Sequence, residues 1–270
     1  ETIANCSAFL VSTMSWHQHA RNIEEAKWNY EFKQQRTGGH LINFGAQHTR
    51  DPLHAQFDRL QRSFESLQPT RLYFEGTGKE IEAVARTAIE RSGEPGFVRY
   101  LSSTHGILAK SLEIDPAKLR SQLADEYGFE QIQLFYTLRT RSQLLRMKRY
   151  SNEQIDRRTE HYLLNAFLDD AENSDLPIKS MSDLKTAYKE YWPNRELLSV
   201  ESSWFNPLIS SSETGSVFLN EVNTTETTLR NQHMYEQLSV ALLNGERILA
   251  VVGRNHVPLQ APALECVAEN

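Results

Sequence analysis

The amino-acid sequence predicts an α/β protein: a central, mostly parallel sheet flanked by helices, with a large helical insertion before the last strand. Four short apolar runs predict the strands, at residues 41–45, 71–76, 107–113 and 247–253. Amphipathic stretches lie between these runs, and strands that alternate with helices favour a parallel sheet covered on both faces. A long helical stretch separates the third strand from the fourth, which indicates an insertion into the α/β core.

The N-terminal segment 1–39 is polar and irregular apart from a few large aromatic side chains, Trp16, Trp28, Tyr30 and Phe32. It shows neither a clear helical period nor a clear strand period. We interpret it as a helical or extended arm that packs on the core.

The first predicted strand, "LINFG" at 41–45, is followed by an amphipathic helix from Asp51 to Leu67. The apolar residues of this helix, beginning with Leu53, recur at three- and four-residue steps. Pro52 falls in its first turn, where proline is well tolerated. We therefore expect one face of the helix to cover the sheet.

Two further helices are predicted between the second and third strands. Residues 79–93 have a strong helical pattern that Gly93 closes. The following segment, 94–106, predicts another helix with Pro95 in its first turn.

The pattern is helical almost throughout from Asp115 to Trp192, and it becomes looser over 193–223. A helix at 226–245 ends in Asn-Gly, a good stop signal, and leads into the last strand. The predicted organisation has three parts: an N-terminal arm at 1–39, an α/β core at 40–114 and 224–270, and a helical insertion at 115–223.

The composition is that of an ordinary globular protein, with 270 residues, 39% hydrophobic residues and a net charge of −6. No apolar run approaches the roughly 18 residues of a membrane span, so no integral membrane span is expected. The mildly acidic balance argues against a nucleic-acid partner. We interpret the basic cluster "RTRSQLLRMKR" (139–149) as the solvated face of a long helix.

The two cysteines, Cys6 and Cys266, stand near opposite ends of the chain. Chain ends often lie close together in domains, so a disulfide and a pair of reduced thiols are both open. The compartment is therefore undecided between cytoplasmic and exported, and no targeting segment is visible. The oligomeric state is also undetermined.

Titratable side chains follow all four predicted strands. His48 lies just past the first strand, Glu75 ends the second, Glu113 ends the third and His256 lies just past the fourth. The carboxyl ends of parallel strands share one edge of a sheet, where ligands bind. Arg230 joins them as a fifth candidate, because a helix that begins near 226 would have its first turn at that edge.

This set of residues supports two kinds of chemistry. His48, Glu75, Glu113 and His256 are suitable ligands for a divalent metal such as manganese, cobalt or zinc. Alternatively, a histidine acts as general base on water without a metal, while a carboxylate orients it and Arg230 stabilises an oxyanion. The expected catalytic residues are His48, Glu75, Arg230 and His256.

Simpler explanations compete with each of these assignments. The Gly-x-x-His pattern is common by chance, although here it occurs twice, each time directly after an apolar strand. Glu75 would also suit the start of the next helix, and Arg230 would suit a helix surface. The pair in "HQH" (17–19) is set aside because the segment does not resemble a strand. Phosphate-loop, dinucleotide, serine-hydrolase and helix-borne zinc-protease motifs are absent.

The motifs resemble those of the Tiki/TraB superfamily, a broad group that includes the ChaN-like proteins and, more remotely, the erythromycin esterases. Three stretches carry the resemblance: "FGAQHTRDP", "LQPTRLYFEG" and "LRNQHMYEQLSVALLNGERILAVVGRNHVP". They hold two Gly-x-x-His motifs, a glutamate after the strand between them and an Arg-Asn step in the helix before the last strand. The two Gly-x-x-His motifs are Gly45–His48 and Gly253–His256, the glutamate is Glu75, and the Arg-Asn step is Arg230–Asn231.

The resemblance implies an α/β fold that holds both histidines and the glutamate in one cleft. Tiki members are divalent-metal-dependent proteases, whereas the esterase branch activates water with a histidine and a glutamate. The esterase branch has a glutamate within its first histidine motif, and Ala46 and Gln47 occupy that space here. The resemblance covers 40–113 and 226–258, and the helical block matches no family pattern.

The leading hypothesis is a Tiki/TraB-like, metal-dependent hydrolase that cleaves a peptide or a small-molecule ester. The alternative is a non-catalytic binding protein or toxin-type domain that keeps the fold, with ChaN-like haem binding. A third possibility places the function in the helical block, in contact with a partner or a membrane.

Overall fold

The computed structural model describes residues 1–12, 16–25, 29–78, 80–168 and 176–270. The chain divides into two compact units. The first comprises 1–113 and 230–270 and contains the sheet, and the second comprises 114–229 and is helical. The sequence placed the insertion at 115–223. No helix among the described residues has the length and apolar character needed to cross a membrane.

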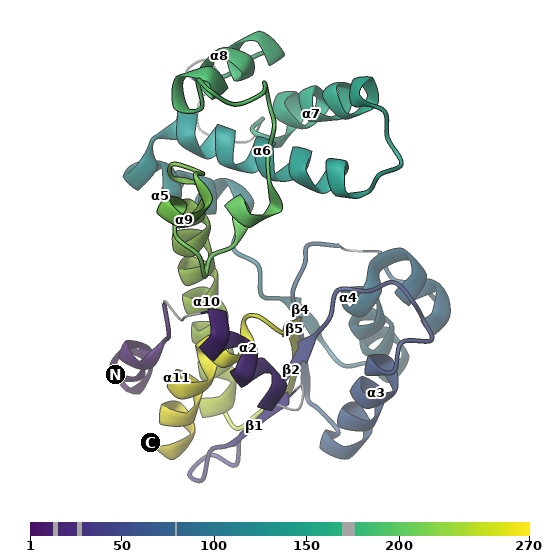
Figure 1. Ribbon diagram of the computed structural model, residues 1–270. Coiled ribbons are helices and arrows are strands. Elements are labelled where there is room, and N and C mark those ends of the chain that lie inside the picture. The colour runs from purple at the N-terminus through teal and green to yellow at the C-terminus, as the bar shows by residue number, and fades with distance from the viewer. Residues whose placement is uncertain (13–15, 26–28, 79, 169–175) are drawn as a thin grey trace. The chain divides into compact units, whose positions relative to one another are not determined.

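The first unit is built on one five-stranded sheet with the order β1-β2-β5-β3-β4 (Figure 1). β2, β5, β3 and β4 are mutually parallel, and β1 pairs antiparallel with β2 at the edge. The mostly parallel sheet predicted from the sequence is therefore confirmed. The strands are β1 (Asn29–Lys33), β2 (His40–Ala46), β3 (Arg71–Phe74), β4 (Ala109–Ser111) and β5 (Arg247–Gly253).

Helices cover both faces of this sheet (Figure 1). The helices α3 and α4 pack on one face, and α10 and α11 pack on the other. The helices with residues in this unit are α1 (Thr2–Cys6), η1 (Ser7–Phe9), α2 (Trp16–Glu25), α3 (Gln56–Leu67), α4 (Ala85–His105), α10 (Leu219–Leu243) and α11 (Val257–Glu269).

Alternation along the central strand β5 explains the two layers. Leu249 and Val251 point into the core with α3 and α4, whereas Ile248, Ala250 and Val252 point into the core with α10 and α11. All five side chains are fully buried. A strand buried on both faces has a continuous apolar run, which is the signal that the sequence shows at 247–253.

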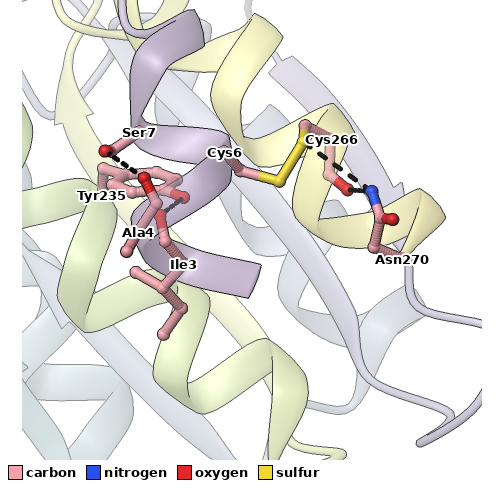
Figure 2. The surroundings of a disulfide bond; sticks show 7 residues. All are labelled: Ile3, Ala4, Cys6, Ser7, Tyr235, Cys266 and Asn270. Carbon is pink, nitrogen blue, oxygen red and sulfur yellow. Dashed lines mark hydrogen bonds between the residues drawn. A yellow bond between two sulfur atoms is a disulfide. The ribbon is translucent and has the colours of Figure 1, made fainter. Parts of the chain in front are cut away.

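The chain ends are joined by a disulfide between Cys6 in α1 and Cys266 in α11 (Figure 2). Their Cα atoms are 5.6 Å apart although 260 positions separate them in sequence. The Tyr235 hydroxyl donates a hydrogen bond to the Ile3 carbonyl at 2.7 Å, and it fixes the same end of the chain to α10. The sequence left open a disulfide or two thiols, and the structure has the disulfide.

The described part of the N-terminal arm contains α1, η1, α2 and the strand β1 rather than a single kind of structure. Val11 donates its backbone N–H to the Leu259 carbonyl at 3.0 Å, so the arm packs on α11. Tyr30 and Phe32 belong to β1, and Phe32 is buried. Trp28 lies outside the described residues.

The second unit is a helical assembly with its own core, which includes Trp192 and Trp204 stacked at 5.1 Å. The prediction that 139–149 forms a solvated face is wrong for Arg141, which is buried and bound to Asp156 at 2.7 Å. Besides the first part of α10, the unit comprises α5 (Pro116–Tyr127), α6 (Phe129–Arg146), α7 (Asn152–Ala166), α8 (Met181–Tyr191), η3 (Ser202–Phe205) and α9 (Ser211–Thr214).

The helix predicted from Asp51 begins only at Gln56, so Pro52 does not lie in its first turn and Leu53 is 83% exposed. The Asp51 carboxylate accepts the backbone N–H of Leu53 at 3.0 Å, and the Asp51 carbonyl accepts that of His54. Such local bonds from an aspartate compete with helix formation.

The helix predicted at 79–93 begins at Ala85, and Lys79 lies outside the described residues. It meets the helix predicted at 94–106 at a kink, where the backbone of Gly93 is not helical, and the two helical segments together carry the label α4. Their junction falls at the predicted glycine.

The helix predicted from 226 begins earlier, at Leu219, so Arg230 lies in its fourth turn rather than its first. The sequence did not predict the start at Leu219, because the threonines that follow it are poor helix formers. Thr224 and Thr228 instead bond the backbone carbonyls four residues earlier, at 3.0 and 2.9 Å. Arg230 therefore reaches the site from the middle of α10.

Candidate functional site

The carboxyl edge of the parallel strands gathers the predicted side chains within the α/β unit. His48 lies two residues after β2, Glu75 directly follows β3, and Glu113 lies two residues after β4. His256 is the N-cap of α11, reached by a short turn from β5. Arg230 contacts Glu75 and Glu113, and His256 lies beside Glu75. His48 and Glu75 both lie next to Gly253.

Glu75 lies at the centre of the site, with 13% of its side chain exposed. Its Oε1 accepts a hydrogen bond from Arg230 Nη2 at 2.7 Å, and its Oε2 accepts the Gly253 N–H at 2.5 Å. Burial acts to raise the pKa of the Glu75 carboxyl. The charge of His256, the charge of Arg230 and the Gly253 N–H act in the opposite direction and hold that pKa well below its ordinary value. Glu75 is therefore a carboxylate at neutral pH.

Arg230 links two of the predicted carboxylates. In addition to Glu75, it binds Glu113 through Nε at 3.2 Å and through Nη2 at 2.8 Å. Its side chain is only 20% exposed. The guanidinium fork suits such paired contacts, and it fixes both acids at the ends of β3 and β4. Arg230 is thus part of this cluster and not a solvated residue of a helix surface.

His256 is held by a buried chain of amide groups. Its Nδ1 lies 3.0 Å from Asn231 Oδ1, which also accepts Gln260 Nε2 at 2.9 Å. Gln260 Oε1 in turn accepts Asn43 Nδ2 at 3.2 Å. Because the amide oxygen can only accept, Nδ1 of His256 carries a proton, and Nε2 faces Glu75 Oε1 at 3.5 Å.

His48 is the most accessible of these groups, with 68% of its side chain exposed. Its Nδ1 forms a short hydrogen bond with Oε1 of Glu94, a carboxylate that is 5% exposed. This bond, reinforced by the negative charge of Glu75, raises the pKa of His48. Glu94 therefore orients the imidazole and leaves Nε2 directed away from it.

Glu94 was not among the residues expected from the sequence. It reaches His48 because α4 kinks at Gly93, whose backbone has φ +62° and ψ −143°. A Cβ atom at this position would lie 2.8 Å from the Thr49 carbonyl oxygen, so only glycine allows the kink to approach the residue that follows His48. The "Gly-Glu-Pro" step at a helix break was the available signal.

Gly253 lies close to the side chains of both His48 and Glu75. A Cβ atom on Gly253 would lie 2.9 Å from His48 Nε2 and 3.0 Å from Glu75 Oε2. Both atoms therefore border one small space above the end of β5. A pocket of about 360 Å³ lies beside these two side chains, and its walls include His48, Glu75, Glu94 and Glu113.

A second histidine, His19, lies near His256, although it was excluded from the candidate site on the basis of the sequence. His19, on α2, is 1% exposed, and its Nε2 lies 3.4 Å from Asn255 Oδ1. Burial, opposed by the bond to Asn255, lowers the pKa of His19. The turn that presents His256 is therefore supported by the N-terminal arm.

The arrangement does not fit the two cofactors considered from the sequence. The carboxylates of Glu75 and Glu113 are both engaged by Arg230, so a metal ion that used them would meet a guanidinium cation. No group of three or more metal-ligating side chains gathers in the part of the chain that the structure describes. A haem requires large apolar side chains against its faces, whereas the residues around this pocket are polar or charged apart from Gly76, Gly93 and Pro95.

No family model, no curated protein and no solved structure matches this chain. The resemblance to the Tiki/TraB superfamily therefore stays a prediction from the motifs. The function is argued below from the residues of the site and their geometry.

Proposed function

We propose that the chain is a hydrolase of acyl bonds, an ester or a peptide, in which His48 and Glu94 activate water. One observation carries this proposal: the His48 imidazole binds a buried carboxylate through Nδ1, and its Nε2 borders a pocket that Glu75 also lines. A histidine oriented in this way by a carboxylate is the common form of a general base.

In the proposed step, neutral His48 takes a proton at Nε2 from a water molecule, and the water oxygen attacks the carbonyl carbon. The imidazolium that forms is stabilised by Glu94. Collapse of the tetrahedral intermediate breaks the bond to the leaving group, which receives the proton from His48. The base is thereby regenerated.

Glu75 and its partners form the second half of the proposed machinery. The carboxylate of Glu75 lies beside His48 Nε2 and orients the water, while Arg230 and the Gly253 N–H fix its two oxygens. We assign Glu113 to the anchoring of Arg230. His256, held by Asn231, lies 3.5 Å from Glu75 Oε1 and helps to lower the pKa of Glu75.

Hydrolysis assays with the full chain test this proposal, using a series of p-nitrophenyl esters and a library of fluorogenic peptides. We expect His48→Ala to lower kcat/KM by at least about 100-fold, the usual contribution of a general base. The control is His17→Ala, which removes an exposed histidine of α2. Equal activity in the two variants, or no activity of the wild type on either series, would contradict the proposal.

Chelation distinguishes this mechanism from the metal-dependent one. We expect hydrolysis to persist after dialysis against EDTA, because Arg230 takes up the carboxylates that a metal would need. Metal content is measured at the same time in the wild type, His48→Ala and His256→Ala. Loss of activity on chelation, with metal missing from both variants, would instead support the metal-dependent hydrolase.

A further inference from the structure

The helical unit contains a pocket of its own, between α6 and α7. Its volume is about 730 Å³, within the range of roughly 300 to 1,000 Å³ typical of small-molecule sites. It is formed entirely by residues 140–166. The proposed hydrolase makes no use of it.

Part of the wall of this pocket is apolar and firmly held, with residues from both α6 and α7. Leu144 of α6 and Ala166 of α7 contribute aliphatic surface, and Tyr162 contributes a ring. The Tyr162 hydroxyl is hydrogen-bonded to Thr140 of α6. The same ring packs edge-on against Phe167 at 6.3 Å, so it is fixed on both sides.

Two arginines border the same pocket. Arg157 and Arg158 are adjacent in α7, and His161 lies one turn later on the same helix. Arg157 pairs with Glu153 at 3.7 Å, and both side chains are well exposed, so this pair is weak. The Arg158 guanidinium lies over the Tyr150 ring at 4.3 Å, a contact with an uncharged side chain.

The surrounding charge reinforces these cations. Residues 139–166 contain seven Lys or Arg and three Asp or Glu, a local net charge of +4 in a chain whose net charge is −6. Arg139 and Arg141 are bound to Glu226 and Asp156. The remaining basic side chains provide a local positive potential that attracts an anion to this unit.

We propose that this pocket binds a small anionic amphiphile, a molecule with a phosphate or carboxylate head and an aliphatic body. The head would bind Arg157 and Arg158, and the body would lie against Leu144, Tyr162 and Ala166. Charge selects the head, and the apolar wall selects the body. An inorganic anion uses only the first feature, and an uncharged lipid uses only the second.

Calorimetric titration of the full chain with dodecyl phosphate, kept below its micelle concentration, tests the site. We expect one molecule to bind, and Arg157→Gln/Arg158→Gln to weaken binding at least tenfold. The matched control is Arg146→Gln/Lys148→Gln, which removes two exposed charges of the same unit outside the pocket wall. This control should change the affinity less than threefold. Leu144→Gln, which keeps every charge, should also weaken binding.

Several results would overturn the site. Equal losses in the two double variants would show general electrostatic attraction, and inorganic phosphate binding as tightly as dodecyl phosphate would remove the role of the apolar wall. Dodecanol binding equally well would remove the role of the arginines. Binding to phosphatidylglycerol vesicles without binding of the monomer would indicate a membrane surface instead. Circular dichroism verifies that each variant is folded.

Discussion

The chemistry at the residue scale depends on how each imidazole is held. His48 has one ring nitrogen bound to a buried carboxylate and the other beside the pocket, whereas His256 is buried and fixed by an amide oxygen. The two histidines therefore have different proposed tasks although their sequence motifs are alike. Because the hydrogen bond to Glu94 is the largest cause of the raised pKa of His48, the pH dependence of hydrolysis reports on that bond.

Replacing Glu94 by Gln should change the pH profile in a defined direction. In the proposed mechanism His48 must be neutral, so kcat/KM rises with pH through the pKa of His48. This rise in kcat/KM should be centred above pH 6.5 in the wild type, because the pKa of His48 in the folded state is raised from 6.5. In Glu94→Gln it should move to lower pH, and the plateau rate should fall by at least about tenfold.

The control for this prediction is Glu90→Gln, which removes an exposed carboxylate of the same helix whose partner is Arg86. Its pH profile should match the wild type. A rise in kcat/KM at the wild-type pH in Glu94→Gln would mean that another group titrates in this range.

At the scale of elements, the site is an assembly of strand ends and helix positions. α10 contributes Arg230 and Asn231, which are adjacent in sequence and face different partners, two carboxylates and His256. His256 is the N-cap of α11, and Gln260 lies one turn later in the same amide network. These two helices thus place the cation and the second histidine, and the parallel strands place the acids.

Substitution of Arg230 by Met should destabilise the fold as well as the site. It leaves Glu75 and Glu113 without their main partner, at a cost of about 2–3 kcal/mol in the free energy of unfolding at neutral pH. The pKa of Glu75 is lowered in the folded protein. The ionised Glu75 therefore stabilises the fold fully above pH 4.5, and this stabilisation is lost as the pH falls through the folded-state pKa. The cost of Arg230→Met should therefore shrink below pH 4.5.

Urea unfolding followed by circular dichroism at a series of pH values measures this difference. Arg86→Met serves as the control, because Arg86 pairs with Glu90 on the exposed face of α4. Its cost should stay below about 1 kcal/mol. An Arg230→Met variant as stable as the control at neutral pH would show that the cluster contributes little.

For the molecule as a whole, one covalent link joins the first helix to the last. The Cys6–Cys266 disulfide closes a loop of nearly the entire chain, and Cys266 belongs to α11, whose N-cap is His256. The arm between Cys6 and β1 packs on α11 and includes His19. The disulfide thus secures the arm that supports the His256 turn.

Removing this disulfide should lower stability measurably. Loop-closure entropy for a separation of 260 residues gives an upper value of about 5.6 kcal/mol, and typical losses are about 2–5 kcal/mol. Thermal melting of the wild type should shift downward in the presence of a reductant. The Cys6→Ser/Cys266→Ser variant should melt at the lower temperature and should not respond to the reductant. A reductant effect on that variant would refute the assignment.

Local signals in the sequence were sufficient to predict the parallel sheet, and they predicted which residues follow its strands. Strand β5 is apolar because both of its faces are buried, and the ends of parallel strands must share an edge, so His48, Glu75, Glu113 and His256 were identifiable as neighbours. The residue Glu94 was not, because its contact with His48 depends on a kink in α4 and on the approach of Gly93 to Thr49.

The sequence by itself thus determined the alternation of strands and helices and the edge at which the polar groups gather, since both follow from short-range periodicity. Only the tertiary structure decided that Arg230 occupies both carboxylates and that Glu94 pairs with His48. These contacts span 155, 117 and 46 positions of the chain. Packing selects such long-range pairs, and no local pattern of residues encodes them.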